Sequence, residues 1–281
     1  MKFGASTFIW ASPFSSDALY LFDKVASMGY SALEVCIEDP ALIDANLLRK
    51  ASEQSGVVVL ICGAFGPGRD ISDTDAMVRQ AGVSYIKTCI DIARAAGAEL
   101  VSGPMYAETG KIGIQTAGAK AERMAFAVEN MKIVADYAKD AGIKLAVEPL
   151  NRFETDFLNT VTQGLAFFDR IAADNVGFLL DTFHMNIEEK NIPDAIRLAG
   201  DKIFNFHACG NDRGAPGADH IDWDGIKEAL QAIDYDGHLV VESFNTDVKE
   251  IARAVSLWRP LAESADALAL DGIRFLQKQF A

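Results

Sequence analysis

One pattern recurs along the whole chain and limits the folds that it can adopt. A short apolar run is followed each time by a longer segment with helical spacing of its apolar residues. Several runs, such as Val57-Val58-Val59-Leu60-Ile61, are apolar at every position, which is typical of a parallel strand covered on both faces. The pattern predicts eight strands, at residues 3–8, 32–37, 57–62, 99–102, 143–147, 176–180, 203–206 and 239–241.

The segments between the runs predict helices packed around those strands. In the segment before the fifth run, Met124, Val128 and Met131 recur every three or four residues between charged side chains. Eight strand–helix units leave about 35 residues for each unit, which is the size of a (β/α)8 TIM barrel. Because no Pro/Ser-rich linker divides the chain, we expect one α/β domain over residues 1–281. The alternative is a doubly wound sheet, but no G-x-G-x-x-G follows the first run.

The charge balance disfavours two classes of partner. The chain has 26 Lys+Arg against 40 Asp+Glu, a net charge of −14, which repels nucleic-acid phosphates and anionic membranes. Its four cysteines form no C-x-x-C pair and lie in apolar segments, as expected for reduced thiols in a cytoplasmic protein. We see neither a signal peptide nor an apolar stretch of the roughly 20 residues that span a membrane. These features predict a cytoplasmic protein without nucleic-acid or membrane partners.

Four side chains of types that can bind a metal follow or end the last four runs: Glu148, Asp181, His207 and Glu242. In a barrel the carboxyl ends of neighbouring strands meet at one mouth, so these side chains would converge. A single acid at a strand end is usually a helix cap or a solvated loop residue. Three carboxylates together, however, must either take up protons or share a cation. With one imidazole they suit a divalent ion such as Mn²⁺ or Mg²⁺, with Co²⁺ as another candidate.

Three more polar residues lie close to these positions in the sequence. Glu154 follows Glu148 by six residues, His184 follows Asp181 by three, and Arg213 follows His207 by six. Such donors and acceptors near a hard metal suit a polyhydroxylated or carbonyl substrate. The structural alternatives are a solvated loop charge for Arg213 and a hydrogen-bonded strand-end imidazole for His184.

Aromatic and sulfur side chains at the strand ends are candidates for the pocket wall, although such residues belong to the core as often as to a pocket. The role of Glu34, on the second predicted strand, stays open. The candidate lining residues are Phe8, Trp10, Cys62, Met105 and Tyr106.

Three stretches resemble the ketose 3-epimerases, which act on D-tagatose, D-allulose (D-psicose) or L-ribulose and belong to the xylose-isomerase-like TIM barrels. The resemblance covers the whole chain, and the run that begins at Asp181 is specific to this branch. It implies one Mn²⁺ or Co²⁺ per subunit and a homodimer or homotetramer. No phosphate-cradling loop is evident in the sequence, which favours a free ketose over a phosphorylated one. The stretches are Glu148-Pro149-Leu150-Asn151-Arg152-Phe153-Glu154, Asp181-Thr182-Phe183-His184-Met185-Asn186-Ile187-Glu188-Glu189 and Trp258-Arg259-Pro260-Leu261.

The resemblance also implies a role for each candidate residue. Glu148, Asp181, His207 and Glu242 would bind the metal, while Glu154, His184 and Arg213 would bind the substrate. The ketose would chelate the metal through O2 and O3, which acidifies the C3 proton by stabilising a metal-bound cis-ene-diolate. Glu148 and Glu242, as the catalytic pair, would remove the proton from one face and return one to the other. The loop at 103–106 lacks a Trp that relatives often carry, so the preferred sugar stays open.

Other functions fit parts of the same pattern. A related isomerase or dehydratase, such as hydroxypyruvate isomerase or an inositol-catabolism enzyme, would share the paired glutamates and the metal. An apurinic endonuclease of the superfamily would need more than the four histidines present and a basic surface instead of a net charge of −14. A non-catalytic sugar-binding protein would have no need for three convergent carboxylates.

Overall fold

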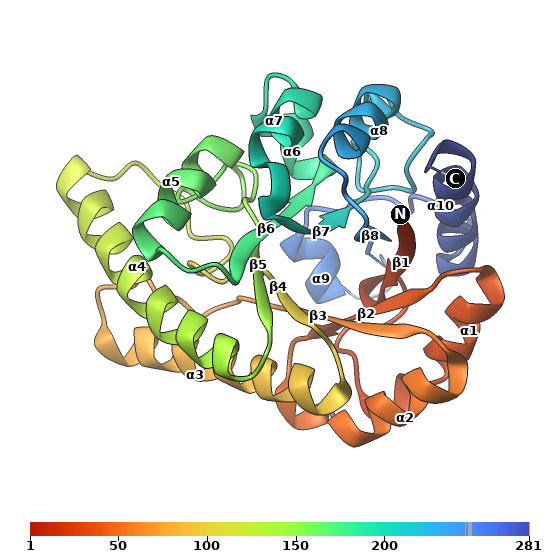
Figure 1. Ribbon diagram of the computed structural model, residues 1–281, viewed down its shortest axis with the longest axis horizontal. Helices are drawn as coiled ribbons and strands as arrows, with labels where there is room; N and C mark the ends of the chain where they lie inside the picture. The colour runs from red at the N-terminus through yellow and green to blue at the C-terminus, as the bar shows by residue number, and fades with distance from the viewer. Residues whose placement is uncertain (245, 247–248, 281) are drawn as a thin grey trace.

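The computed structural model describes residues 1–244, 246 and 249–280, with the backbone alone at position 250. Its eight strands run parallel and pair in chain order, and β1 pairs with β8 to close the barrel (Figure 1). The structure confirms the predicted (β/α)8 fold. Ala281, the last residue of the predicted domain, lies outside the described residues. The strands are β1 (Lys2–Ser6), β2 (Ala32–Ile37), β3 (Val58–Gly63), β4 (Leu100–Gly103), β5 (Lys144–Val147), β6 (Val176–Asp181), β7 (Ile203–His207) and β8 (His238–Val241).

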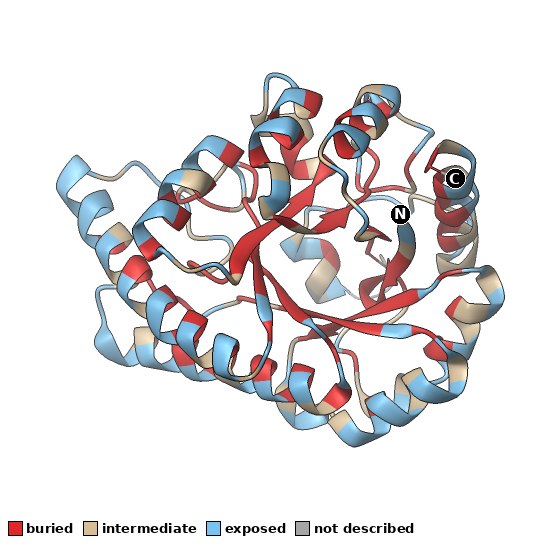
Figure 2. Ribbon diagram, in the orientation of Figure 1, coloured by how far each residue is buried: buried red, intermediate tan, exposed pale blue. Residues whose placement is uncertain are grey.

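Helices surround the barrel as an outer layer, and the strands between them are buried along most of their length (Figures 1 and 2). A shorter helix, α9, is seen through the ring of strands instead of in the outer layer (Figure 1). The helices are α1 (Leu21–Met28), α2 (Ala45–Ser55), α3 (Ala76–Ala96), α4 (Ala117–Asp140), α5 (Val161–Ile171), α6 (Thr182–Glu188), α7 (Ile192–Ala199), α8 (Trp223–Ala232), α9 (Lys249–Ala254) and α10 (Ala265–Phe280).

The sequence accounts for these elements locally. Every residue of β2 and of β6 is buried, as expected for strands packed between the barrel interior and the helices. Helix α5 begins with a capping box in which the Thr160 side chain and the Gln163 side chain each bond to the other residue's backbone N–H. Helix α3 ends at Gly97, whose φ of 80° is readily adopted only by glycine. One cluster of buried apolar residues extends from Ala5 to Phe280.

The first strand is shorter than predicted. It ends at Ser6, and residues Thr7–Ile9 form a 3₁₀ helix. The Ser6 hydroxyl accepts a hydrogen bond from the backbone N–H of Phe8 and so caps this turn. Strand side chains alternate between the two faces of the sheet only as far as Ser6. The directions of the Phe8 and Trp10 side chains therefore do not follow from the strand pattern. In the described part of the chain, none of the helices combines the length and the apolar character needed to cross a bilayer.

Candidate active site

Four polar side chains meet at the carboxyl ends of the last four strands. Asp181 and His207 end β6 and β7 and are register partners, while Glu148 and Glu242 directly follow β5 and β8. His207 Nδ1 lies 3.7 Å from Asp181 Oδ2 and 3.6 Å from Glu242 Oε1. Potential ligand atoms of Glu148, Asp181 and His207 all lie within 4.8 Å of one another. All four residues are buried, with at most 6% of their surface exposed. We call these four residues the metal cluster.

The imidazole of His207 fits a metal ligand. Its Nε2 lies 2.8 Å from Glu34 Oε2 and donates its proton to that carboxylate. Its Nδ1 is buried and has no hydrogen-bond partner among the described residues. A hydrogen bond from one ring nitrogen to a carboxylate orients the ring and leaves the other nitrogen free to ligate. In the neutral ring the lone pair of Nδ1 faces Asp181 and Glu242, where a cation would sit.

The acid–base properties of the cluster show an excess of negative charge. Burial and the neighbouring Glu242 carboxylate raise the pKa of Glu148 well above its usual range. Burial, with Asp181 nearby, also raises the pKa of Glu242. Burial opposes a charge on His207 too, but Glu34 and Glu242 raise the pKa of its imidazole well above the usual value. The cluster therefore attracts protons. A divalent cation supplies the same positive charge, and three carboxylates with one imidazole suit a hard ion.

Glu34 completes the environment of His207 from the opposite side of the barrel. It lies on β2, is fully buried, and accepts a hydrogen bond of 2.8 Å from the Asn205 side chain. The Ser102 hydroxyl lies 3.3 Å from the same carboxylate oxygen. The one sequence signal for this role is an acidic residue inside an otherwise apolar strand, Ala32-Leu33-Glu34-Val35-Cys36-Ile37. Its partner, His207, is 173 residues away along the chain.

A second set of side chains borders the cluster. Arg213 Nη2 donates to Glu154 Oε1 at 2.6 Å, and its Nη1 lies 3.8 Å from Glu242 Oε2. His184 Nε2 lies 3.5 Å from Glu148 Oε1. The backbone N–H of Asn151 donates to His184 Nδ1, so Nε2 carries the ring proton of the neutral imidazole. Burial lowers the pKa of His184 and favours this neutral form.

The Arg213 side chain is held by its aromatic neighbours. Its guanidinium lies 4.1 Å from the Phe183 ring centroid and 4.9 Å from that of Phe244, both within range of cation–π attraction. Its backbone adopts a φ of 69°, a strained value for a residue with a side chain. The Ser243 hydroxyl donates to the Arg213 carbonyl at 2.7 Å and helps to hold this conformation. The result is a buried, pre-positioned cation beside two glutamates.

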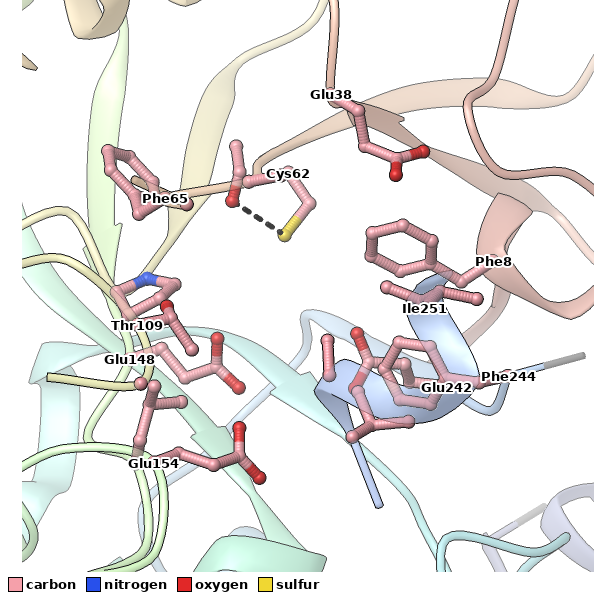
Figure 3. Close-up of a pocket in the computed structure, with 18 of the residues that line it drawn as sticks. Phe8, Glu38, Cys62, Phe65, Thr109, Glu148, Glu154, Glu242, Phe244 and Ile251 are labelled. Atoms are coloured by element: carbon pink, nitrogen blue, oxygen red, sulfur yellow. Dashed lines mark hydrogen bonds between the residues drawn. The ribbon is translucent and has the colours of Figure 1, made fainter. Parts of the chain in front are cut away.

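These side chains open into a pocket of about 380 Å³ (Figure 3). Glu148, Glu154 and Glu242 lie toward one end of the pocket in this view, and apolar side chains form much of the remaining wall. Helix α9 contributes Ile251 and Ala254 to that wall. A largely apolar cavity of this size with a few convergent polar groups is typical of a small-molecule site. Its apolar lining includes Phe8, Ala64, Phe65, Pro67, Pro104, Leu150, Phe244 and Val255.

Comparisons with known proteins agree with this geometry. A family model described as xylose isomerase-like TIM barrel matches residues 22–279. The D-psicose 3-epimerase of Agrobacterium fabrum is 32% identical over 276 residues, which cover 96% of this chain and 94% of that protein. The L-ribulose 3-epimerase of Mesorhizobium japonicum is 33% identical over 278 residues, 98% of this chain and 93% of that protein. The chain belongs to the ketose 3-epimerase family.

A solved structure extends the likeness to the backbone. The D-allulose 3-epimerase from Methylomonas sp., in complex with D-allulose, matches with a TM-score of 0.93 at 29% identity. The match covers 99% of this chain and 97% of that chain. The present chain is accordingly an isomerase, as predicted. Its buried Glu/Asp/His cluster agrees with a metal site in this epimerase family.

Not every residue predicted to line the pocket of this family member lies on its wall. Phe8 and Cys62 do, but Trp10 and Met105 are not among the residues that form it. Trp10 follows the 3₁₀ turn, and its indole N–H donates to Asp266 on α10 at 2.7 Å. Met105 follows a tight turn at Gly103, whose φ is 124°, and is fully buried in the core. Tyr106 stacks on Phe157, away from the pocket, with ring centroids 5.4 Å apart.

The sequence did not reveal several residues that form the pocket. Phe65 and Phe244 lie in loops beyond β3 and β8, and Ile251 lies on α9. None of them belongs to a recognisable catalytic or binding motif. Their positions depend on how the loops fold over the barrel mouth. Glu38, at the carboxyl end of β2, also lines the pocket. Its position one residue after a buried strand was the one available signal.

Proposed function

We propose that this family member epimerises free ketoses at C3, with Glu148 and Glu242 as the acid/base pair. The observation that carries the proposal is the placement of these two buried glutamates on different walls of one pocket, beside a cluster suited to a metal (Figure 3). Inversion at a carbon without net chemistry needs one group to remove a proton and another to return a proton to the opposite face. The relatives' activities, on D-psicose and L-ribulose, support the same reaction class.

The proposed cofactor is one divalent ion per subunit, with Mn²⁺ preferred over Co²⁺ or Mg²⁺. Glu148, Asp181, His207 and Glu242 would hold it, as the unpartnered Nδ1 of His207 among three carboxylates supports. When bound, such an ion acts as a Lewis acid that stabilises negative charge on the sugar oxygens. Three carboxylates and one imidazole are a donor set that this class of ion accepts.

Glu148 and Glu242 would move the proton. One carboxylate takes the C3 proton from the face that it borders, and the other, in its acid form, delivers a proton to the opposite face. Burial raises the pKa of both groups in the metal-free protein, which favours the acid form that one of the two must take. Because the reaction is reversible, the two residues exchange roles between the two directions.

Glu154, His184 and Arg213 would position the sugar. The Nε2–H of His184 and the guanidinium of Arg213 are donors, and the Glu154 carboxylate is an acceptor for a hydroxyl group. The ion pair between Arg213 and Glu154 keeps both charges in place before a substrate arrives. The apolar wall of Phe8, Phe65 and Phe244 would limit contact of the sugar with water.

The test is isotope exchange. Purified protein loaded with Mn²⁺ is incubated in D₂O with D-fructose, D-tagatose and L-ribulose, and the products are followed by NMR. We expect the C3 epimer to form and deuterium to appear at C3. The variant Glu122→Gln, which changes an exposed glutamate on α4, serves as a control with unchanged turnover.

Three outcomes would contradict this proposal. A folded, metal-loaded protein that places no deuterium at C3 of any ketose would show that the reaction is wrong. Deuterium at C1 or C2 together with an aldose product would instead indicate the alternative, a related sugar isomerase on the same barrel. Formation of a dehydrated product would indicate a dehydratase.

We further propose that the enzyme is a homodimer or homotetramer, because its family resemblance implies such an assembly. Sedimentation velocity of the purified protein tests this. A single species of 30.4 kDa at micromolar concentration would contradict it.

A further inference from the structure

One charged residue of the pocket takes no part in the mechanism above. Glu38 directly follows β2, and its carboxylate points into the pocket from the end remote from Glu148, Glu154 and Glu242 (Figure 3). Among the described lining residues, it is the one charged side chain outside the group around the metal cluster. Its neighbours along the wall, such as Phe8 and Cys62, are apolar or weakly polar.

One of the two oxygens of the Glu38 carboxylate has a hydrogen-bond partner among the described residues, and the other has none. Its Oε1 accepts a hydrogen bond of 2.7 Å from the Ser12 hydroxyl. Its Oε2 is buried and has no hydrogen-bond partner among the described residues. Burial raises the pKa of Glu38, although Ser12, the Phe14 backbone and Arg69 act in the opposite direction. A buried carboxylate oxygen without a donor is unfavourable, so a ligand that brings a hydroxyl group would relieve the defect.

The nearby Arg69 is already used elsewhere. Its Nη2 donates to the Glu38 backbone carbonyl and its Nη1 to the Ala64 carbonyl, each at 2.6 Å. The guanidinium also lies 3.8 Å from the centroid of the Tyr85 ring. Arg69 therefore holds the backbone on both sides of the pocket end and leaves Oε2 of the carboxylate unpaired. That oxygen has no hydrogen-bond donor among the described residues.

The proposed reaction sets the direction of the sugar in the pocket. With C3 between Glu148 and Glu242, one end of the sugar borders Glu154, His184 and Arg213, and the other end extends toward the remaining space. That space ends at Glu38. We propose that Glu38 accepts a hydrogen bond from the terminal hydroxyl of a ketohexose, O6, and so selects free ketohexoses against their 6-phosphates. This inference rests on the proposed function and assigns a specificity-determining residue to it.

The selection has two physical parts. A carboxylate is a good acceptor of a hydrogen bond from a hydroxyl group. A sugar that lacks O6 leaves Oε2 of Glu38 unpaired and therefore binds less well. A phosphate at the same place brings two negative charges against the carboxylate, which is unfavourable in a largely apolar pocket. Attraction and repulsion at one residue thus favour the same sugar.

The experiment compares three sugars with three proteins. The sugars are the ketohexose that the wild-type protein converts fastest, its 6-deoxy analogue and its 6-phosphate. The proteins are the wild type, Glu38→Ala and Glu38→Gln, each loaded with Mn²⁺. Glu53→Gln, at an exposed position of α2, is the matched control for removal of one glutamate charge.

The expected result is a loss that depends on O6. Glu38→Ala lowers kcat/KM for the ketohexose by roughly tenfold to a hundredfold, the range for a hydrogen bond to a charged group. It changes kcat/KM for the 6-deoxy sugar by no more than about twofold, because that sugar cannot make the bond. Glu38→Gln raises the 6-phosphate to ketohexose ratio of kcat/KM by roughly tenfold. Metal affinity and melting temperature stay as in the wild type.

The outcomes separate this inference from the proposed function. Equal losses for the ketohexose and the 6-deoxy sugar would overturn it, since Glu38 would then only shape the pocket. No loss for either sugar, or a wild type that converts ketopentoses but no ketohexose, would overturn it as well. In each of those cases C3 epimerisation itself would persist. Absence of turnover by the wild type with every ketose would overturn the proposed function and this inference together.

Discussion

Two groups of acidic residues at the same mouth of the barrel are neutralised in different ways. The loop ion-pair network consists of Asp70, Asp73, Lys111, Arg123 and Asp156. There, Lys111 lies 2.8 Å from Asp70 and 2.5 Å from Asp73, and Arg123 lies 3.0 Å from Asp156. In the metal cluster the carboxylates instead face one another and an imidazole.

The difference separates a structural role from a chemical one. In the network every acid has a basic partner, and Lys111 lowers the pKa of Asp73 although burial opposes this. In the metal cluster the pKa of Glu148 and the pKa of Glu242 are raised by burial, and Arg213 is shared with Glu154. Ion pairs inside the chain complete the first group. The second group keeps an excess of negative charge, and perturbed carboxyl groups in a pocket point to function.

The largest effect is expected where the metal cluster loses a catalytic carboxylate. Glu242→Gln removes the group proposed to serve one face of C3, so kcat should fall by roughly 10²- to 10⁴-fold. Asp156→Asn, in the loop ion-pair network, should leave kcat unchanged. Turnover and C3 deuterium exchange measure both. If Glu242→Gln, with its metal site occupied, kept kcat within tenfold of the wild type, the proposed role of Glu242 would be wrong.

The next effect concerns the orientation of His207. Glu34→Gln keeps an oxygen that can accept the His207 Nε2–H but removes the charge that orients the ring and strengthens its other nitrogen as a ligand. Loss of such an outer partner weakens metal binding by roughly 10- to 100-fold. Calorimetric titration of Mn²⁺ into the apo protein gives the dissociation constant. An unchanged value, with Glu53→Gln as the control, would show that Glu34 merely fills the barrel interior.

The loop ion-pair network and the metal cluster should also differ in how loss of one carboxylate changes the stability of the protein. Asp70→Asn removes one of the two carboxylate partners of Lys111 and the charged acceptor of the Ser72 hydroxyl, and should destabilise the protein by about 2 kcal/mol. Glu148→Gln removes one of several mutually repelling carboxylates and should raise the melting temperature of the metal-free protein. Both are measured by thermal unfolding after chelation. A decrease in both variants would mean that the two groups are neutralised alike.

The smallest effect is the pH dependence of metal removal. Glu148, Glu242 and His207 have raised pKa values in the folded protein. Their contribution to stability is therefore full below their unfolded pKa values and is lost as the pH rises through the folded ones. Asp181, whose pKa is lowered, loses its contribution only as the solution becomes strongly acidic. The metal-free protein should weaken between pH 5 and pH 8, while the Mn²⁺ form changes less.

Differential scanning fluorimetry with and without a chelator measures the gap, which is the difference in melting temperature between the Mn²⁺ form and the metal-free form. The gap should widen by about 3 °C over that pH range, which corresponds to about 1 kcal/mol. Asp70→Asn should keep the same widening, because the loop ion-pair network takes no part in metal binding. A gap that narrows as the pH rises would contradict the proposed titration of the metal cluster.

Much of the fold could be predicted from the sequence because continuous apolar runs and helical spacing are local signals. Residues 32–37 and 203–206 agree closely with β2 and β7. The first predicted strand was too long, because the Ser6 side chain caps a 3₁₀ turn that apolar character alone does not reveal. The same turn accounts for the misplaced Trp10. Met105 was misplaced because the turn at Gly103 directs it into the core.

The sequence by itself determined that Glu148, Asp181, His207 and Glu242 would come together. In a closed barrel of parallel strands, strands that are consecutive in the chain are neighbours in space. A residue's place at the carboxyl end of a strand is therefore enough to predict which other strand ends lie beside it. Only the tertiary structure decided what each side chain faces. The contact of His207 with Glu34 joins distant strands across the barrel interior. Whether Glu38 Oε2 has a hydrogen-bond partner depends on where Ser12 and Arg69 lie. Such contacts depend on side-chain direction and packing, which no local pattern encodes.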